Sequence, residues 1–319
     1  MNKRLVLLVA VFVIAALVIS LLYIHLQHGR YKEITVRFAV EFNTHSSAFW
    51  VALDKGFFKE EGIRVEYKVY STGLELAAAL LRGEFDFAIA CIGPLLIVRE
   101  KGVPVKLVAM MHNHGYAILT SPKHNITNFE EVRNGKATAS GPGSPTWLIL
   151  ELAMRKYNVS SLSIQRTPPF IATTMLLTGK TDIASLPEHY VSLAESMGAH
   201  VILTSREIWP DMPGSGLAVR EEYLEKYFDI VLAVTRALAK AVEYINEYPD
   251  EAAKIVAKYL ATDVGIIENS LQNMVFDIRI DEGEIEKYIT YLVELGALSH
   301  RISVSEFIDK RVLNSIEYG

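Results

Sequence analysis

One stretch of sequence occurs twice: Leu80-Leu81-Arg82-Gly83-Glu84-Phe85-Asp86-Phe87-Ala88 returns 96 residues later as Leu176-Leu177-Thr178-Gly179-Lys180-Thr181-Asp182-Ile183-Ala184. In each copy the pattern predicts a helix that ends at a glycine, followed by a short buried strand. Two copies of one unit indicate two lobes of similar construction. Three further pairs agree at the same offset: Gly102 with Gly198, Val105 with Val201, and Leu107 with Leu203.

The chain around the two copies alternates between strand and helix patterns. Residues 63–70 alternate between apolar and polar side chains, which predicts a half-buried strand. Residues 46–55 predict a helix that ends at Gly56, because glycine readily takes the left-handed conformation found at helix ends. This alternation is typical of an α/β protein. Towards the C-terminus, helices are predicted over residues 221–247, 249–261, 264–277, 282–296 and 304–316.

The repeat sets the expected domain organisation. We expect a leader over residues 1–33, a first lobe made of residues 34–118 and 213–319, and a second lobe over residues 119–212. The chain would then cross between the lobes twice. Two lobes joined by extended segments enclose a cleft, and clefts of this kind bind small molecules.

The leader contains a long apolar run. Lys3 and Arg4 precede residues 5–24, twenty residues without a charge. A helix of that length spans about 30 Å, the thickness of a bilayer core. No small-residue cleavage site and no cysteine for a lipid anchor follow the run. We therefore expect a signal anchor: a single-pass transmembrane helix in the cell membrane, with the body on the extracellular side.

Composition excludes several classes of function. The chain has 319 residues, with 32 Lys+Arg against 37 Asp+Glu and no basic run. This acidic balance argues against a nucleic-acid partner. The single cysteine, Cys91, excludes an internal disulfide and a cysteine-rich zinc site. The stability of the fold must therefore come from an apolar core.

The sequence contains no complete catalytic or cofactor motif. Thr178-Gly179-Lys180-Thr181 lacks the earlier glycine of a phosphate-binding loop, and Gly141-Pro142-Gly143 lacks the third glycine of a dinucleotide fingerprint. No Ser-His-Asp, Cys-His or Gly-x-Ser-x-Gly pattern stands out. His112 and His114 have a spacing that suits a metal, but no third ligand follows. We expect no enzyme activity, no cofactor and no metal site.

Two turns between a strand and a helix present polar groups. Ser144 and Pro145 begin a predicted helix directly after the strand predicted over residues 136–140. Asn43-Thr44-His45-Ser46 occupies the matching turn of the first lobe. Free backbone N–H groups at a helix start suit an anionic or polar ligand, although a capped helix needs no ligand to explain it. Because both lobes present such a turn to one cleft, we favour the ligand.

The stretch Phe49-Trp50-Val51-Ala52-Leu53-Asp54-Lys55-Gly56-Phe57-Phe58-Lys59-Glu60-Glu61-Gly62-Ile63 resembles the opening of the nitrate/sulfonate/taurine-type solute-binding proteins of ATP-binding-cassette importers. The resemblance extends over about residues 34–310 as a set of weaker matches. It implies a two-lobed periplasmic-binding-protein-like fold of type II, with two crossovers, that closes on one small molecule. It also implies a cognate permease as partner, and we expect a monomer. The further matches are Gly73, residues 80–86, Gly135-Lys136, Pro168-Pro169, residues 176–182, Pro187-Glu188, residues 248–253 and the C-terminal stretch 295–309.

The same superfamily includes enzymes that make the thiamine pyrimidine. Those enzymes carry a cysteine-rich motif, whereas this chain has only Cys91. The acidic position of the family's second-lobe element is displaced here to Pro187-Glu188-His189, which leaves the ligand class open. A biosynthetic enzyme and a membrane-anchored sensor on the same fold are therefore kept as alternatives.

We expect the ligand-binding residues at the carboxyl ends of the strands. The first lobe contributes Phe42, Asn43, Thr44, His45, Ser71, Thr72, Gly73, Cys91, Ile92 and Gly93, with His112, His114 and Tyr116 near the first crossover. The second lobe contributes Gly141, Gly143, Ser144, Thr146, Phe170, Glu188 and His189. None of these residues is Lys or Arg, so a sulfonate- or nitrate-like anion would bind through neutral donors. An amino-heterocycle such as the thiamine pyrimidine would instead stack on aromatic rings and donate to Glu188.

Overall fold

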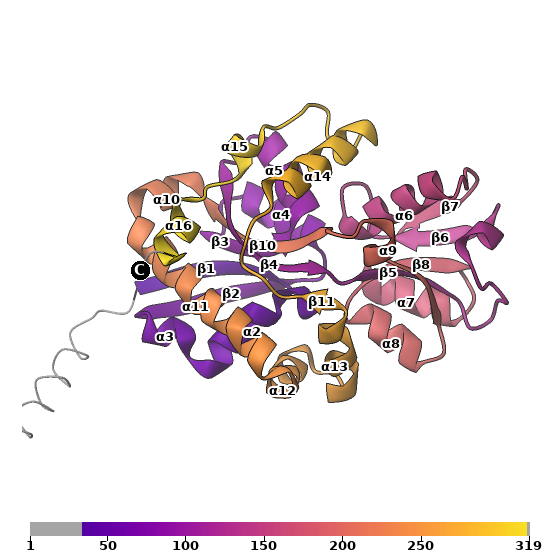
Figure 1. The fold of residues 1–319 in the computed structure, drawn as a ribbon, viewed down its shortest axis with the longest axis horizontal. Helices are drawn as coiled ribbons and strands as arrows, with labels where there is room; N and C mark the ends of the chain where they lie inside the picture. The colour runs from indigo at the N-terminus through magenta and orange to yellow at the C-terminus, as the bar shows by residue number, and fades with distance from the viewer. Residues whose placement is uncertain (1–33, 318–319) are drawn as a thin grey trace, which may run out of the picture. The chain divides into compact units, whose positions relative to one another are not determined.

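The computed structural model describes residues 34–317, which form two β-sheets with helices packed on both faces of each sheet (Figure 1). The first sheet has the strand order β11-β4-β10-β3-β1-β2 and the second has the order β7-β6-β8-β5-β9. The first sheet comprises β1 (Ile34–Glu41), β2 (Ile63–Tyr70), β3 (Phe87–Cys91), β4 (Val105–His114), β10 (Pro213–Arg220) and β11 (Met274–Val275). The second comprises β5 (Tyr116–Thr120), β6 (Lys136–Ala139), β7 (Ser163–Arg166), β8 (Ile183–Pro187) and β9 (His200–Thr204).

The repeated sequence lies at corresponding places in the two sheets. Its first copy leads into β3 and its second into β8, and both strands are internal to their sheets. β3 pairs parallel with β1, and β8 pairs parallel with β6. Each also has an antiparallel neighbour, β10 for β3 and β5 for β8. The two-lobed α/β architecture follows from this shared topology.

The chain changes sheet abruptly after β4. Only Gly115 separates β4 from β5, and both His114 (φ 63°) and Gly115 (φ 85°) adopt left-handed backbone conformations. The return passes from the second sheet through α9 (Ser205–Ile208) into β10. The lobe boundaries expected at residues 118/119 and 212/213 stay a prediction.

Each face of the first sheet has its own apolar core. The side chains of Val36, Phe38 and Val40 point to a core shared with α2 (Ser47–Lys55), α11 (Phe228–Glu247) and α12 (Pro249–Leu260). Ala39 points the opposite way, to a core shared with α4 (Gly73–Leu81), α5 (Ile92–Glu100) and α14 (Glu282–Glu294). The alternation of a β-strand therefore supplies both cores from one segment.

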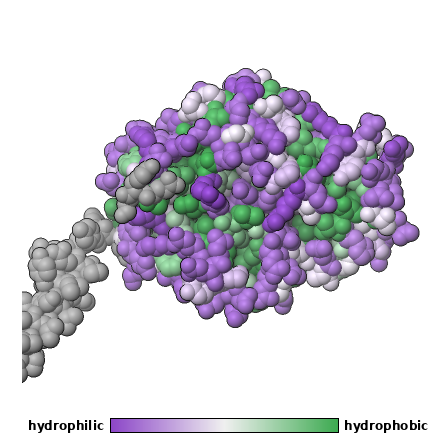
Figure 2. All heavy atoms as spheres, in the orientation of Figure 1, coloured by the Kyte–Doolittle hydropathy of each residue, from purple (hydrophilic) through white to green (hydrophobic). Residues whose placement is uncertain are grey.

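The remaining helices complete the layers. The second sheet is covered by α6 (Pro145–Lys156) on one side and by α7 (Pro169–Leu177) and α8 (Tyr190–Ser196) on the other (Figure 1). Apolar side chains reach the visible face in several separate areas (Figure 2). The other short helices are η1 (Thr44–Ser46), α3 (Phe57–Glu60), η2 (Phe129–Val132), α10 (Glu221–Lys226), α13 (Val264–Gln272), α15 (Val304–Phe307) and α16 (Arg311–Glu317).

Three of the predicted C-terminal helices are interrupted or end early. The helix predicted over residues 221–247 is interrupted at Tyr227, whose backbone (φ −133°, ψ 46°) is not helical. The helix predicted over residues 264–277 ends at Gln272, because Met274 and Val275 pair with the edge of β4 as β11. The segment 304–316 divides into α15 and α16, since Ile308 is extended and forms a bridge to Leu107. Periodicity alone does not reveal these tertiary pairings.

The prediction of an N-terminal transmembrane helix is not supported. Among residues 34–317, no helix is both long enough and apolar enough to cross a bilayer. The 20 residues of α11 have the required length, but they include charged side chains such as Arg236 and Lys240, which form ion pairs with Glu61 and Glu60. The predicted span, residues 5–24, lies outside the described residues.

The core beneath β1 gives a first test. The Phe38 ring is fully buried, with its centroid 5.0 Å from that of Phe87 and 5.2 Å from that of Phe49. We expect Phe38→Ala to lower the free energy of unfolding by about 3–5 kcal/mol, because it removes an aromatic side chain and leaves a cavity. Urea denaturation measures this loss. The control variant Ile34→Ala removes a side chain that is 43% exposed, so its free energy of unfolding should change by no more than about 0.5 kcal/mol. Equal losses in the two variants would contradict the placement of Phe38 in the core.

Candidate functional site

A small cavity lies between the two sheets, where four helices begin. Its volume is about 30 Å³, which is room for about two water molecules. α4, α5, α6 and α7 all contribute residues of their first turn to its wall. Eight of the predicted ligand-binding residues line it: Asn43, Ser71, Thr72, Gly73, Cys91, Tyr116, Ser144 and Thr146.

Two of the four helices, α4 and α6, start with polar caps from residues that line this cavity. Thr72 Oγ1 accepts a hydrogen bond from the Glu75 N–H, and Ser144 Oγ accepts one from the Trp147 N–H. The first N–H groups of a helix have no partner within the helix, and the aligned peptide dipoles place partial positive charge there. The convergence of four such ends makes the cavity favourable for negative charge.

One carboxylate already occupies part of this positive region. Glu41, at the end of β1, is buried, and its Oε1 accepts a hydrogen bond of 3.0 Å from the Cys91 N–H at the start of α5. Its Oε2 accepts one of 3.1 Å from Asn43 Nδ2. Burial raises the pKa of the Glu41 carboxyl despite these bonds. A Cβ on Gly73 would lie 2.6 Å from Glu41 Oε1, so a larger residue there would displace the Glu41 carboxylate.

Sequence reasoning missed Glu41. Its signal was available, since Glu41 is the first charged residue after the apolar run 38–40 and stands at the carboxyl end of a strand. β1 pairs parallel with β3, and the carboxyl ends of parallel strands form the edge at which ligands bind in α/β sheets.

A thiol and two imidazoles lie beside Glu41. Cys91 Sγ is 3.4 Å from Glu41 Oε2, 3.7 Å from His45 Nδ1 and 3.2 Å from the Tyr116 hydroxyl. The His45 ring also packs on His112, with centroids 4.6 Å apart. Burial lowers the pKa of His45 to about 4 and also lowers the pKa of His112, so both rings are neutral at pH 7. In the part of the chain that the structure describes, no Lys or Arg lines the cavity.

The lobes touch through two glycines next to the cavity. A Cβ on Gly93, in the first turn of α5, would lie 2.1 Å from the carbonyl oxygen of Gly143. Gly143 has a φ of 83°, and its own Cβ would lie 2.1 Å from Ile97 Cδ1. These predicted site residues therefore permit a close approach of the two backbones, and the cleft is closed.

Seven other predicted residues lie away from the cavity. Phe42 and Phe170 have relative exposures of 36% and 50% and do not line it. Thr44 hydrogen-bonds to Ser270 Oγ at 2.8 Å, and Ile92 belongs to the apolar core. Gly141 has a φ of 115° and packs against the Arg166 side chain. The remaining two, His114 and His189, are buried, and burial lowers the pKa of each to about 4.

Glu188 has internal partners rather than a place in the cavity. Its carboxylate accepts hydrogen bonds of 2.8 Å from both Ser192 Oγ and Asn273 Nδ2. Burial raises its pKa to about 7. It lines a different cavity of about 180 Å³, which also includes Arg206 and Asn273. Because Asn273 follows α13 and Glu188 follows β8, this bond links the C-terminal helices to the second sheet.

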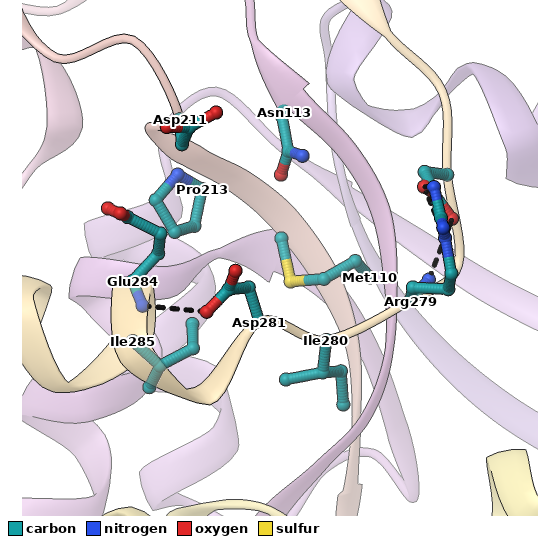
Figure 3. A pocket seen from close by; sticks show the side chains of 10 residues that line it. Met110, Asn113, Asp211, Pro213, Arg279, Ile280, Asp281, Glu284 and Ile285 are labelled. Carbon is teal, nitrogen blue, oxygen red and sulfur yellow. Dashed lines mark hydrogen bonds and ion pairs between the residues drawn. The ribbon is translucent and has the colours of Figure 1, made fainter.

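A larger cavity of about 320 Å³ lies between β4 and the segment that precedes α14 (Figure 3). Its walls carry four carboxylates, from Asp211, Asp277, Asp281 and Glu284. Arg279, the one basic residue of this wall, forms an ion pair with Asp277. This cavity is therefore unfavourable for an anion.

The chain belongs to the NMT1/THI5 like family, which matches residues 43–252. Among sequence relatives, a Bacillus subtilis (strain 168) protein provisionally named for binding aliphatic sulfonates is 26% identical over 255 residues, which cover 77% of this chain and 75% of that protein.

Two solved structures share the fold. The ligand binding component of an ABC-type import system from Staphylococcus aureus, with zinc bound, has a TM-score of 0.78 at 18% identity and covers 88% of this chain and 98% of that one. The periplasmic nitrate-binding protein NrtA from Synechocystis PCC 6803 has a TM-score of 0.81 at 14% identity and covers 89% and 88%. These similarities confirm the predicted two-lobed periplasmic-binding-protein fold and the resemblance to solute-binding proteins of ATP-binding-cassette importers.

The expected location is corrected by the same findings. We predicted a single-pass protein of the cell membrane with an extracellular body. The helices within residues 34–317 include none able to cross a membrane, and the NrtA structure is that of a periplasmic protein. The membrane anchor is therefore not retained.

The glycine contact gives a second test. Gly93→Ala places a methyl group against the Gly143 carbonyl, so the lobes cannot close fully. We expect ligand binding to weaken about 5- to 150-fold, since overpacking costs about 1–3 kcal/mol. Small-angle X-ray scattering should show a larger radius of gyration for the variant. The control Gly283→Ala adds a methyl group in the exposed first turn of α14 and should change neither quantity; identical behaviour of the two variants would disprove the closing role.

Glu188 gives a third test, of pH dependence. Because its folded pKa of about 7 lies above the ordinary value of 4.5, its contribution to stability is present at low pH and is lost as the pH rises through 7. Glu188→Gln removes this dependence. Relative to the wild type, the variant should gain about 2–3 kcal/mol of unfolding free energy between pH 5 and pH 8. The exposed control Glu222→Gln should show no such gain. If the difference in unfolding free energy between Glu188→Gln and the wild type is the same at pH 5 and pH 8, the pKa of Glu188 is not raised.

Proposed function

We propose that this protein is the solute-binding component of an ATP-binding-cassette importer and that it captures a small sulfonate- or nitrate-like anion in the cavity beside Glu41. The observation that carries the proposal is the convergence of four helix starts on one closed cavity. The N–H groups at the starts of α4 and α6 and the hydroxyls of Ser144 and Thr146 would hold the anion without Lys or Arg, whereas Pro94 of α5 and Pro169 of α7 have no N–H to offer.

The relatives support this class of ligand. The Bacillus subtilis relative is named for aliphatic sulfonates, and the Synechocystis structure is of a nitrate-binding protein. The small volume of the closed cavity, about 30 Å³, favours the smaller members of this class, such as nitrate, over larger sulfonates. The partner would be a cognate permease that receives the ligand from the closed protein, which acts as a monomer.

A second candidate ligand is an amino-heterocycle such as the thiamine pyrimidine. The observation that favours it is the buried Glu41 carboxylate, which could accept a hydrogen bond from an exocyclic amino group. Tyr116 lines the same cavity and offers an aromatic ring. Phe42 and Phe170 lie outside the cavity. Of the aromatic residues expected to stack on the heterocycle, Tyr116 is therefore the one that lines the cavity.

A single substitution separates the two candidates and gives a fourth test. Glu41→Gln removes a negative charge from the wall of the cavity. Measured in buffer without divalent metals, the variant should therefore bind anions several-fold more tightly than the wild type. It should weaken binding of an amino-heterocycle about tenfold, since a hydrogen bond to a charged group contributes about 1.5–3 kcal/mol. Isothermal titration would use methanesulfonate, nitrate, taurine and an aminopyrimidine as probes, after a thermal-shift screen of the full-length protein.

The matched control is Glu222→Gln, an exposed carboxylate in α10, which should leave every affinity unchanged. The proposed anion function fails if no anion of the panel binds the wild type. It also fails if anions bind and Glu41→Gln has no effect on them in metal-free buffer.

A further inference from the structure

We propose that Glu41, His45 and Cys91 form a zinc site in the wall of the cleft, with one coordination position directed to the ligand. This inference deepens the proposed function, because the metal would lie in the same cavity. It rests on side chains from three separate segments: the end of β1, the turn η1 and the end of β3. All three are at least nine-tenths buried.

The spacing of the three donor atoms fits a tetrahedral zinc ion. Bonds of about 2.3 Å to sulfur and about 2.0–2.1 Å to nitrogen and oxygen place tetrahedral ligand atoms about 3.5 Å apart. Cys91 Sγ is 3.7 Å from His45 Nδ1 and 3.4 Å from Glu41 Oε2. One donor atom from each residue lies within 4.8 Å of the other two. Shifts of a few tenths of an ångström to about one ångström would complete the site.

The orientation of His45 leaves the correct nitrogen available. Its Nε2 is 3.0 Å from the carbonyl oxygen of Gly115, which can only accept, so Nε2 carries the proton. Nδ1 therefore presents its lone pair to Cys91 and Glu41. A backbone carbonyl that fixes the second ring nitrogen is the usual support for a metal-binding histidine.

A metal ion would also remove an electrostatic conflict in the cavity. The helix starts favour an anion, whereas an ionised Glu41 repels it. Zn²⁺ bound by one carboxylate, one thiolate and one neutral imidazole gives a set without net charge. Its fourth position would accept an oxygen of the anion, because Glu41 and Cys91 both line the cavity. The ion would enter when the lobes are open.

The donor set selects the class of metal. Sulfur and imidazole nitrogen suit Zn²⁺, whereas Mg²⁺ and Ca²⁺ prefer sites made of oxygen alone. Binding replaces the hydrogen of the Cys91 thiol by zinc, and the released proton goes to the buffer. No oxidation or reduction is involved.

The test is a calorimetric titration: Zn²⁺ is added to the metal-free, full-length protein and the heat of binding is measured. We expect one equivalent to bind with release of a proton, seen as a dependence of the heat on the buffer's ionisation enthalpy. Cys91→Ser and Glu41→Gln should each weaken binding more than about 100-fold, beyond the 10–100-fold typical of partners that only orient a ligand. Mg²⁺ and Ca²⁺ should not bind at this site.

The control variant is His200→Ala, which removes an exposed histidine at the start of β9 and should leave zinc affinity unchanged. Circular dichroism melting shows whether each variant folds. A second measurement needs no variant: Co²⁺ bound to the wild type should show a thiolate-to-metal charge-transfer band, which Cys91 alone can supply. Absence of the band, or zinc binding that Cys91→Ser and Glu41→Gln leave intact, overturns the proposal.

The two proposals fail separately. If the anion panel binds in metal-free buffer but zinc does not bind, the metal site is wrong and the importer function stands. If zinc binds through Cys91 and no anion binds with or without it, the metal site stands and the anion function fails. With zinc present, Glu41→Gln should weaken anion binding, whereas without metal it should strengthen it. If the substitution strengthens anion binding in both conditions, the anion is not coordinated by the zinc ion.

Discussion

The closed form of this protein depends on the contact between the backbones of Gly93 and Gly143. Because neither residue carries a side chain, the first turn of α5 can approach the turn that leads into α6. The space that remains between the sheets is about 30 Å³ and is bordered by the starts of four helices. The small size of the cavity follows from this approach, whereas Asn43 and Cys91, the hydrogen-bond partners of Glu41, belong to the first sheet and its loops.

Much of the fold could be predicted from local sequence. The repeat at residues 80–88 and 176–184 identified β3 and β8, which occupy equivalent internal positions in the two sheets. The helix expected at residues 46–55 is observed as α2 and ends at Gly56 in the left-handed conformation. The C-terminal region was harder to predict, because β11 forms by pairing with β4, which lies about 160 residues earlier in the chain. The hydrophobic periodicity of a local segment does not show such a distant pairing.

The position of the cavity could be predicted from the sequence, but the partners of its side chains could not. Ser144, Thr146 and Cys91 were expected together because the helices that follow parallel strands such as β3 and β6 start at the same edge of each sheet, and all three line one cavity. The role of each carboxylate could not be predicted, since it depends on side-chain partners. Glu188 is held by Ser192 and Asn273, whereas Glu41 faces the cavity. The proximity of His45 to Cys91 likewise arises only when β1 and β3 pair.

Amide hydrogen exchange tests most directly the claim that helix starts in the closed cleft bind a small ligand. Exchange of the full-length protein would be followed with nitrate, methanesulfonate and taurine in turn, each with and without zinc. The account predicts that at least one condition slows exchange at the first N–H groups of both α4 and α6, which belong to different lobes. The account would be contradicted if no condition slowed exchange. It would also be contradicted if the slowed N–H groups all lay in one lobe or around the acidic cavity before α14.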